Sequence, residues 1–458
     1  MPQPDSPAAL RTAAVDAHRR GDLARAQDLY ARYLALVPGD AGHWSNLGVL
    51  LRTSGRHAMA LRVQQRAYAL TPDAPGVRNN YANILSDLGD YERSVALRHE
   101  ALEKTPGDLN QLAMIGRCYR GMGKYRAAVA HLEPLVTQYP DEAEFQIQLA
   151  FARLGAGDYA QGFQDYRARW GSAELTPRNI PFAQWDGQTD LAGKSVLVLP
   201  EQGFGDAVLF NRLLPLLAAH GARVLLLVEK PMARLFQDVA GADWVGTALP
   251  VSEKVDYWIN VMDLPLLGLH SRADIPPPTR LHVPADSVAR AQTIVAPYAD
   301  SFRVGVVWTG SLTYKGNAFR SFGHTDFLPL TDLPGVQLFS LYKGPALHAY
   351  RADGSSALIV DAAGTDRDLA DCAATMQQMD LIITSDTATA HIAGSLGLPC
   401  WTILHWDPFW VFTHRGAKTP WYPSMRLFRQ TTPLDWSEVM GRVRDALERH
   451  VAKLRGAA

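Results

Sequence analysis

The sequence has little cysteine and almost no net charge. Its 458 residues include three cysteines, and the formal net charge is −1. Cys118, Cys372 and Cys400 stand far apart, so neither a disulfide framework nor the ligand spacing of a metal site is expected. The missing basic excess argues against a protein that grips nucleic-acid phosphates. With 47% hydrophobic and 20% charged residues, the composition is that of a globular chain of several domains.

Long apolar runs are also missing. The longest, SVLVLP at 195–200 and VLLLVE at 224–229, have the length of strands and fall far short of the ~20 residues of a membrane span. The amino-terminal segment has no apolar core of the kind that marks a secretory signal. We therefore expect a cytoplasmic protein that does not insert into membranes.

Two common phosphate-binding patterns are absent as well. No GxxxxGK[ST] segment occurs, which argues against a P-loop kinase or ATPase. The GFGD turn has Gly203 and Gly205, but Val208 takes the place of the third glycine of a dinucleotide fingerprint. No DxD-type carboxylate pair stands at a convincing position, so we expect the chemistry of this chain to be metal-independent.

A 34-residue repeat fills the first third of the chain. Prolines recur at 38, 72, 106 and 140, and glycines recur at 21, 55, 89, 123 and 157. Gly48 and Ala82 occupy one position of successive units, where a small residue lets a second helix cross closely. This period is that of the tetratricopeptide helix–turn–helix unit. We predict an array of about five units over residues 1–172.

The array predicts a groove for an extended peptide. Stacked units form a superhelix whose concave surface is lined by the first helix of each unit. Asn46 and Asn80 hold equivalent inward positions, and Gln148 follows two units later. Amide groups both donate and accept hydrogen bonds, so they suit a peptide backbone. Tyr81 and Arg117 are further candidates, and a purely structural array with solvated polar residues is the alternative.

From about residue 182, strand-like apolar runs alternate with helix-length segments. This alternation predicts parallel sheets in two α/β lobes, at 182–290 and 300–430, followed by a helix at 431–458. The proline-rich stretch IPPPTRLHVP is the expected linker between the lobes. Ligands of such folds bind beyond the carboxyl ends of the strands, so the strand-to-helix turns should hold the site.

The turn EQGFGD follows the strand at 195–200. Gly203 and Gly205 permit a tight bend and the close approach of a ligand. Asp206 then opens a helix and is our candidate for a general base. Helix capping is its alternative role, and Glu201 is a competing carboxylate in the same turn.

The turn ITSDTATAH ends a strand at Ser385 and begins a helix near Asp386 or Thr387. Exposed amides at such a helix start, including that of Ala388, attract the phosphates of a nucleotide. Thr387 and His391 share one helix face because they stand four residues apart. The alternative is a capped helix with His391 turned toward a neighbouring strand.

The loop TGSLTYKGNAFRSF follows a strand that ends at Trp308. Its Lys315, Asn317 and Arg320 suit the neutralisation and binding of phosphate, and a solvated surface loop is the alternative. A later aromatic segment, HWDPFWVFTHRGAKTPWYPSMRLFRQ, suits either stacking on sugars and bases or packing between the lobes.

Four segments carry a specific resemblance. EQGFGDAVLFNRLLPLL, KGNAFRS, SDTATAHIAGSLG and TPWYPSMRLFRQ, in this order behind the repeats, resemble the bacterial tetratricopeptide glycosyltransferases. Their catalytic half is similar to the ADP-heptose:lipopolysaccharide heptosyltransferases, and the layout is similar to O-GlcNAc transferase. The resemblance covers nearly the whole chain. It implies a tetratricopeptide α-solenoid followed by a GT-B module, with two Rossmann-like lobes, an acceptor side in the first, the donor in the second, and a carboxy-terminal helix packing back on the first.

The resemblance also implies residue roles. Asp206 corresponds to the catalytic aspartate, and Lys315 to a lysine that contacts donor phosphate. Asp386, Thr387 and His391 fall in the donor-binding DTxxxH stretch. KGNAFRS stands where relatives often show KNDxxRS, and HWDPFWVF replaces a more usual apolar-Pro start, so the donor's identity stays open.

We therefore expect a protein O-glycosyltransferase that needs no cofactor. It would move a sugar from a nucleotide-sugar donor to Ser or Thr of a protein held by the repeats. Some members of the group glycosylate flagellin with a nonulosonic acid, which makes flagellin a candidate acceptor. The alternatives are a lipopolysaccharide-type heptosyl transferase and a non-catalytic repeat adaptor.

Overall fold

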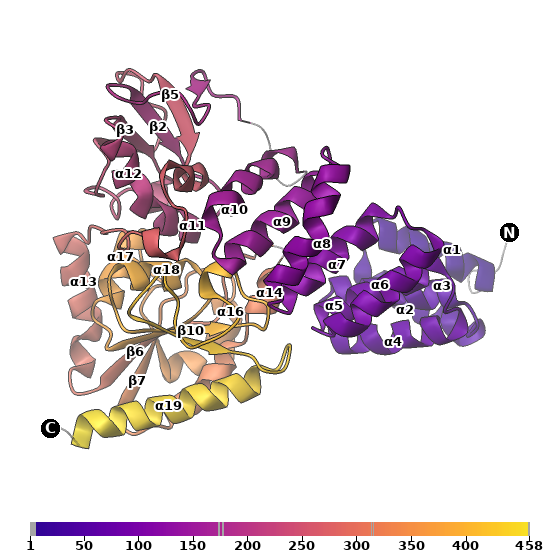
Figure 1. The fold of residues 1–458 in the computed structure, drawn as a ribbon. Coiled ribbons are helices and arrows are strands. Elements are labelled where there is room, and N and C mark those ends of the chain that lie inside the picture. The colour runs from indigo at the N-terminus through magenta and orange to yellow at the C-terminus, as the bar shows by residue number, and fades with distance from the viewer. Residues whose placement is uncertain (1–5, 173–174, 176–177, 313, 315, 457–458) are drawn as a thin grey trace. The chain divides into compact units, whose positions relative to one another are not determined.

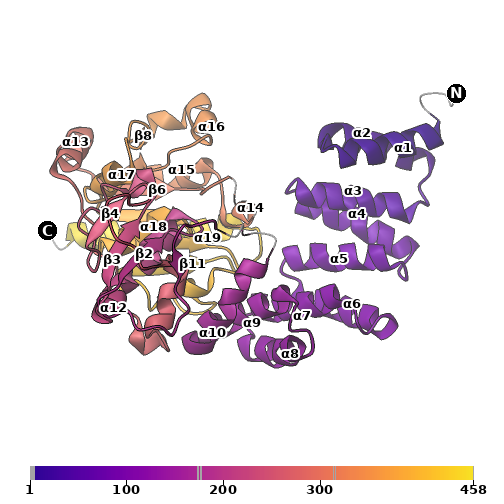
Figure 2. The same ribbon diagram turned by 90° about the horizontal axis from the view of Figure 1, so that it is seen from above.

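Helices form the first part of the chain in the computed structural model, which describes residues 6–172, 175, 178–312, 314 and 316–456 (Figure 1). Contacts divide the chain into a unit at 1–152 and a second unit at 153–458. The helices of the first unit form successive pairs (Figure 2). They are α1 (Pro7–Arg19), α2 (Leu23–Leu36), α3 (Ala41–Thr53), α4 (His57–Leu70), α5 (Pro75–Asp87), α6 (Tyr91–Lys104), α7 (Leu109–Gly121), α8 (Tyr125–Gln138) and the larger part of α9 (Ala143–Ala156).

The repeated residues explain these pairs. Gly55 ends a first helix with a φ of +74°, in the left-handed region that an L side chain rarely adopts. Gly116 lies where two helices cross, and a Cβ there would stand 2.6 Å from Leu132 Cδ2. Asp22 and Asp90 cap second helices by accepting backbone N–H bonds. The predicted helical solenoid is confirmed.

The last repeat pair lies partly in the second unit. It ends with α10 (Tyr159–Tyr166) and the 3₁₀ helix η1 (Arg167–Gly171). The N–H groups of Tyr159 and Ala160 donate to the carbonyl oxygen of His270 at 3.1 Å, and the Phe163 ring lies 6.0 Å from that of Phe210. The last helix of the array predicted over 1–172 is therefore part of the second unit, where its aromatic face is buried.

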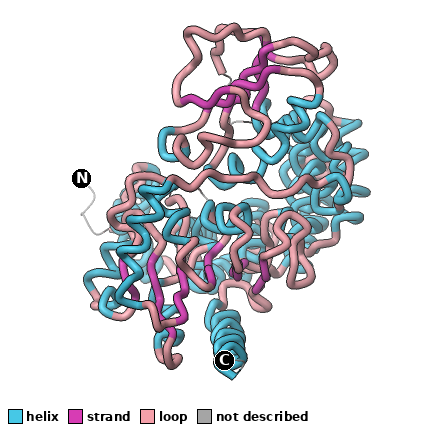
Figure 3. The backbone as a smooth tube through the Cα atoms, turned by 90° about the vertical axis from the view of Figure 1, so that its left-hand side faces the viewer, coloured by secondary structure: helices cyan, strands magenta, loops and turns pink. Residues whose placement is uncertain are grey.

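Two parallel sheets organise the second unit (Figure 3). The sheet of the first lobe has the order β1-β5-β2-β3-β4, and the sheet of the second lobe has the order β11-β10-β9-β6-β7-β8. The strands of the first are β1 (Ala183–Gln184), β2 (Ser195–Leu199), β3 (Arg223–Leu227), β4 (Trp244–Gly246) and β5 (Tyr257–Asn260). Those of the second are β6 (Phe302–Val307), β7 (Val336–Ser340), β8 (Ile359–Asp361), β9 (Leu381–Ser385), β10 (Cys400–Leu404) and β11 (Met425–Arg429).

Helices cover these sheets, as the alternating sequence pattern predicted. The central strands β2, β9 and β10 are buried along their whole length, which is typical of a parallel sheet covered on both faces. The helices of this unit are α11 (Phe204–Phe210), α12 (Leu214–Ala219), α13 (Ala285–Val295), α14 (Asn317–Arg320), α15 (Leu328–Thr331), α16 (Leu347–Ala352), α17 (Leu369–Met376), α18 (Ala388–Ser395) and α19 (Trp436–Gly456). In the described residues, no helix combines the length and hydropathy that crossing a bilayer requires.

The carboxy-terminal helix α19 packs on the second lobe. It contacts β11 and α15, and the His450 ring lies 5.7 Å from Phe302 and 6.1 Å from Trp401. The apolar residues Val443 and Leu447 are buried there. The prediction that this helix packs back on the first lobe is therefore wrong, because its apolar face is covered by the neighbouring elements of its own lobe.

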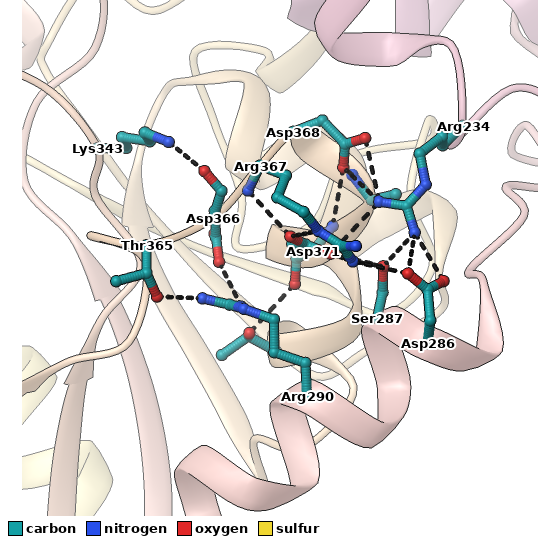
Figure 4. Close-up of polar contacts among 12 residues, drawn as sticks. Arg234, Asp286, Ser287, Arg290, Lys343, Thr365, Asp366, Arg367, Asp368 and Asp371 are labelled. Atoms are coloured by element: carbon teal, nitrogen blue, oxygen red, sulfur yellow. Dashed lines mark hydrogen bonds and ion pairs between the residues drawn. The ribbon is translucent and has the colours of Figure 1, made fainter.

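An ion-pair network joins the two lobes (Figure 4). Arg234 of the first lobe donates through Nη2 to both oxygens of Asp286, at 2.7 and 2.8 Å, and through Nη1 to Asp368 at 3.2 Å. Asp371 is buried beside this pair and accepts from Ser287 Oγ at 2.6 Å. Opposite charges from the two lobes thus meet next to the start of α17.

Candidate functional site

The turns after β2 and β9 meet in the second unit. A Cβ on Gly205 would lie 2.9 Å from His391 Cδ2 and 3.5 Å from the Cα of Ala388. The start of α11 therefore lies directly against the start of α18, at a distance that only glycine permits. We call residues 201–206 and 385–391 the facing turns.

Asp206 caps the helix that it opens. Its Oδ2 accepts the Gly203 N–H at 3.1 Å, which is the capping role weighed as its alternative. Its Oδ1 accepts no hydrogen bond from any described residue, and the side chain is half-buried. One carboxylate oxygen thus holds the backbone, and the other is free to receive a proton.

Burial raises the pKa of Asp206 to about 6. The negative charges of Asp386 and Glu201 act in the same direction, whereas the Gly203 hydrogen bond and the Arg320 charge oppose them. A carboxyl group with this pKa changes charge close to neutral pH, where a general base is most effective.

Glu201 is committed to an ion pair. Arg169 of η1 donates to its two oxygens at 2.7 and 2.8 Å, and to Asp263 Oδ1 at 2.7 Å. All three side chains are buried. A bidentate pair engages both oxygens of the carboxylate. Of the two carboxylates in this turn, Asp206 is the one with a free oxygen.

Gln202, which lies between Glu201 and Asp206 in the sequence, has a strained backbone conformation. Its φ is +61°, which is uncommon for a residue other than glycine. Its Nε2 donates to Tyr166 Oη at 2.6 Å. Tyr166 and Arg169 thus hold the first facing turn from the end of the repeat array. Neither residue was predicted from the sequence, although YRARW interrupts the repeat pattern with aromatic and basic residues.

The second facing turn offers open backbone donors. Within the described chain, the N–H groups of Ala388 and Thr389 have no acceptor, as is normal for the first turn of a helix. Thr387 Oγ1 bonds to Thr384 Oγ1 at 3.2 Å, so this hydroxyl group is already engaged. Ser385 is fully buried, and its Oγ has no partner. The open donors of this turn are therefore backbone amides.

His391 is buried and neutral. Its Nδ1 lies 3.0 Å from Tyr422 Oη. Burial, with the charges of Arg212 and Arg320, lowers the pKa of His391 to about 3. His391 is thus a hydrogen-bonding group at every physiological pH, because it does not gain a proton there.

The loop after β6 reaches the same helix start. Asn317 is buried, its Oδ1 accepts the Gly310 N–H at 3.2 Å, and its Nδ2 donates to Thr309 Oγ1 at 3.0 Å. A Cβ on Gly310 would lie 3.0 Å from Arg320 Nη2 and 3.1 Å from Thr387 Cγ2. Arg320 therefore lies beside the start of α18, whereas Asn317 braces the loop. Lys315 falls outside the described residues.

The late aromatic segment packs rather than stacks on a ligand. Trp410 and Trp421 are buried, and their rings lie 5.4 Å apart. Tyr159 of α10 contacts both rings, at 5.7 and 5.8 Å. Of the two roles weighed for this segment, the structure favours packing for these tryptophans.

Three of the predicted groove residues lie at the surface of the repeat array. Asn46 and Asn80 are half-buried, and Asn80 Nδ2 donates to Ser45 Oγ at 2.9 Å. Arg117 is exposed and has no hydrogen-bond or ion-pair partner in the described part of the chain.

The other two are wrong. Tyr81 is only 5% exposed, its ring lies 5.0 Å from that of Tyr68, and its hydroxyl group accepts from Arg93. Gln148 is 8% exposed, and its amide already bonds to Arg120 and Glu144. Each side chain faces its repeat neighbours, so neither is open to a peptide.

Comparisons with known proteins agree with the repeat architecture. A family model described as tetratricopeptide repeat matches residues 11–75 and 113–173. Protein FlbA of Caulobacter vibrioides is 30% identical over 456 residues, which cover 92% of this chain and 75% of that protein. Superkiller protein 3 of Schizosaccharomyces pombe is 29% identical over 116 residues, or 25% of this chain and 8% of that protein. The solved structure of YrrB, a TPR protein with an unusual peptide-binding site, aligns at 14% identity with a TM-score of 0.32, covering 36% of this chain and 86% of that one.

Proposed function

This chain belongs to the family of Protein FlbA, and we propose that it is a GT-B glycosyltransferase that moves a sugar from a nucleotide-sugar donor to a protein hydroxyl group. One observation carries the proposal: a carboxylate with a free oxygen, on Asp206, faces a helix start with open N–H groups, at α18. Sugar transfer needs a base for the acceptor proton and donors for the leaving phosphate.

The donor side of the proposed site is in the second lobe. A phosphate at the start of α18 would accept from the N–H groups of Ala388 and Thr389, where the helix dipole also favours negative charge. Arg320 lies beside this point and supplies a full positive charge. These groups would stabilise the phosphate as it leaves the sugar.

The proposed reaction exchanges one bond at the sugar's anomeric carbon. The acceptor hydroxyl oxygen forms a bond to this carbon while the bond from the carbon to the phosphate oxygen breaks. The hydroxyl proton moves to Asp206 Oδ1, and the phosphate keeps the bonding electrons. The acceptor is Ser or Thr of a protein held by the repeats. Flagellin and a nonulosonic acid are the first pair to test, because the resembling group includes flagellin-modifying members.

Intact-mass spectrometry tests this function. The purified chain is incubated with flagellin and, in turn, CMP-, UDP-, ADP- and GDP-sugars. We expect one donor to add the mass of one sugar residue to flagellin. Transfer to lipid A precursors alone would favour the heptosyl-type alternative. The absence of a mass gain with every donor and acceptor would favour a non-catalytic adaptor.

The proposed base predicts the pH dependence of transfer. Asp206 accepts a proton only when ionised, so we expect kcat/KM to rise as pH increases through about 6. The Asp386 charge helps to raise the pKa of Asp206, so Asp386→Asn should move this rise to lower pH. A pH–rate profile at subsaturating donor measures both effects. As a control, Asp380→Asn removes a charge at the other end of β9 and should leave the pH midpoint of the kcat/KM profile unchanged. If Asp386→Asn does not shift this midpoint either, Asp386 and Asp206 are not electrostatically coupled.

A further inference from the structure

Arg98, on α6, is a buried cation without a carboxylate partner. It is 0% exposed, and burial lowers its pKa. Its guanidinium group donates to three neutral oxygens: Ser94 Oγ at 3.3 Å, Gln111 Oε1 at 2.8 Å and Asn83 Oδ1 at 2.7 Å. Among the residues that the structure describes, no acid pairs with it. Burying a charge without a counter-ion costs folding free energy, so its presence suggests a role other than stability.

The cation fixes the direction of three amides. A guanidinium group only donates, so the atoms facing it on Asn83 and Gln111 must be their oxygens. The Nε2 of Gln111 therefore points away from Arg98, and it donates to Asn79 Oδ1 at 2.9 Å. The oxygens of Asn79 and Asn83 are both used inside the array, which leaves their NH₂ groups as the free ends.

These free ends share one face of the array. Asn79 and Asn83 stand four residues apart on α5, so they lie on the same side of that helix. Both are half-buried, and neither NH₂ group donates to a described residue. Arg117, on α7, follows Asn83 by one repeat and adds an exposed, unpaired guanidinium group. We call Asn79, Asn83 and Arg117 the donor face.

We propose that the donor face binds an acidic, extended peptide segment, with Arg98 as the positioning residue behind it. Every outward polar group of the face donates hydrogen bonds, and one carries positive charge, so carboxylates and backbone carbonyl oxygens are its complement. The proposal deepens the proposed function by giving the protein acceptor a chemical character. Its test measures binding without a donor sugar, so a failure to bind and a failure to transfer are distinguishable.

The absence of a carboxylate partner for Arg98 keeps the outward group of residue 83 a hydrogen-bond donor. Asp at position 83 would give Arg98 a counter-ion with the same shape as Asn. Its second oxygen would then face outward and repel a peptide carboxylate. The buried charge is thus left with neutral partners, and the outward group stays a donor.

The test uses the full chain and an array of short synthetic peptides of varied Asp and Glu content. We expect the retained peptides to be enriched in Asp and Glu. Their matched Asn and Gln counterparts should bind about tenfold or more weakly in fluorescence-anisotropy titrations, because a charged hydrogen bond is lost. Arg117→Gln and Asn83→Asp should each weaken the acidic peptides to a similar extent.

Asn83→Asp also separates binding from folding. It should raise the melting midpoint, because Arg98 gains a carboxylate, while it weakens binding. Gln65→Glu, an equal charge change at an exposed site on α4, should alter neither quantity. Three results would overturn the proposal: no acidic enrichment, unchanged affinity in a folded Asn83→Asp chain, or equal competition by an oligothymidylate, which would indicate nucleic acid instead.

Discussion

Replacing Asp206 with Asn should greatly slow sugar transfer and make the chain more stable near neutral pH. Asparagine keeps the shape of the side chain and can still accept the Gly203 N–H. It cannot take the acceptor proton, and losing a general base slows a reaction by about 10²–10⁴-fold. The rate of mass gain on the acceptor measures this loss.

The gain in stability follows from the raised pKa. The pKa of Asp206 is about 6 in the folded chain, above its ordinary value, so folding is favoured by protonation and is weakened as pH rises through 6. Removing the charge should add on the order of 1–2 kcal/mol at pH 7 and nothing below about pH 4. Urea unfolding at the two pH values measures the difference. A variant that transfers sugar at the normal rate, or that loses stability only at pH 7, would contradict the role assigned to Asp206.

Replacing Arg169 with Met should cost about 3–5 kcal/mol of unfolding free energy in the second unit. The change leaves Glu201 and Asp263 buried with no cation, and removing one partner of a buried ion pair has this magnitude. Transfer should also fall, because Arg169 holds the residue two positions before the Gly203 bend. Denaturant unfolding, followed by the tryptophans that surround α10, measures the loss.

A second change tests whether buried charge is the cause. Adding Glu201→Gln to Arg169→Met removes one unpaired carboxylate and should recover part of the lost stability. Arg178→Met, near the same turn, removes a cation that donates to the Pro200 carbonyl oxygen instead of a carboxylate, and should cost much less. If the double variant is no more stable than Arg169→Met alone, lost packing around the guanidinium stem explains the effect.

Most of the fold could be predicted from patterns of residues that are close together in the sequence. A strict period fixed the helix pairs, because one small residue per unit is needed at each helix crossing, as at Gly116. Continuous apolar runs identified central strands such as β2 and β9. Glycines after β2 identified the first facing turn, because close backbone approach is a local requirement, as at Gly205. The second facing turn was identified by the end of a strand at Ser385 and the start of a helix directly after it.

The wrong predictions concern side chains whose environment is set by residues distant in sequence. Tyr81 and Gln148 occupy surface-like positions of the repeat, but Arg93 and Arg120 from other helices bind them. The helix α19 has one apolar face, and its sequence pattern would be the same whichever lobe that face contacts. The sequence alone therefore does not show on which lobe the helix packs. Arg98 gave no signal, because an arginine on a helical segment with acids nearby in sequence, such as Glu100, looks solvated. Its three acceptors come from three different helices.

The docking of η1 onto the first facing turn has a consequence for how such chains evolve. The cation that neutralises Glu201 and Asp263 is contributed by the final half-repeat, not by the lobe that contains those acids. Exchange of whole repeat arrays between relatives, with a junction at residue 172, would remove that cation along with the donor face. A junction that keeps this cation lies upstream of η1, so the end of the last repeat is inherited with the sheets, and the units before it are free to diversify.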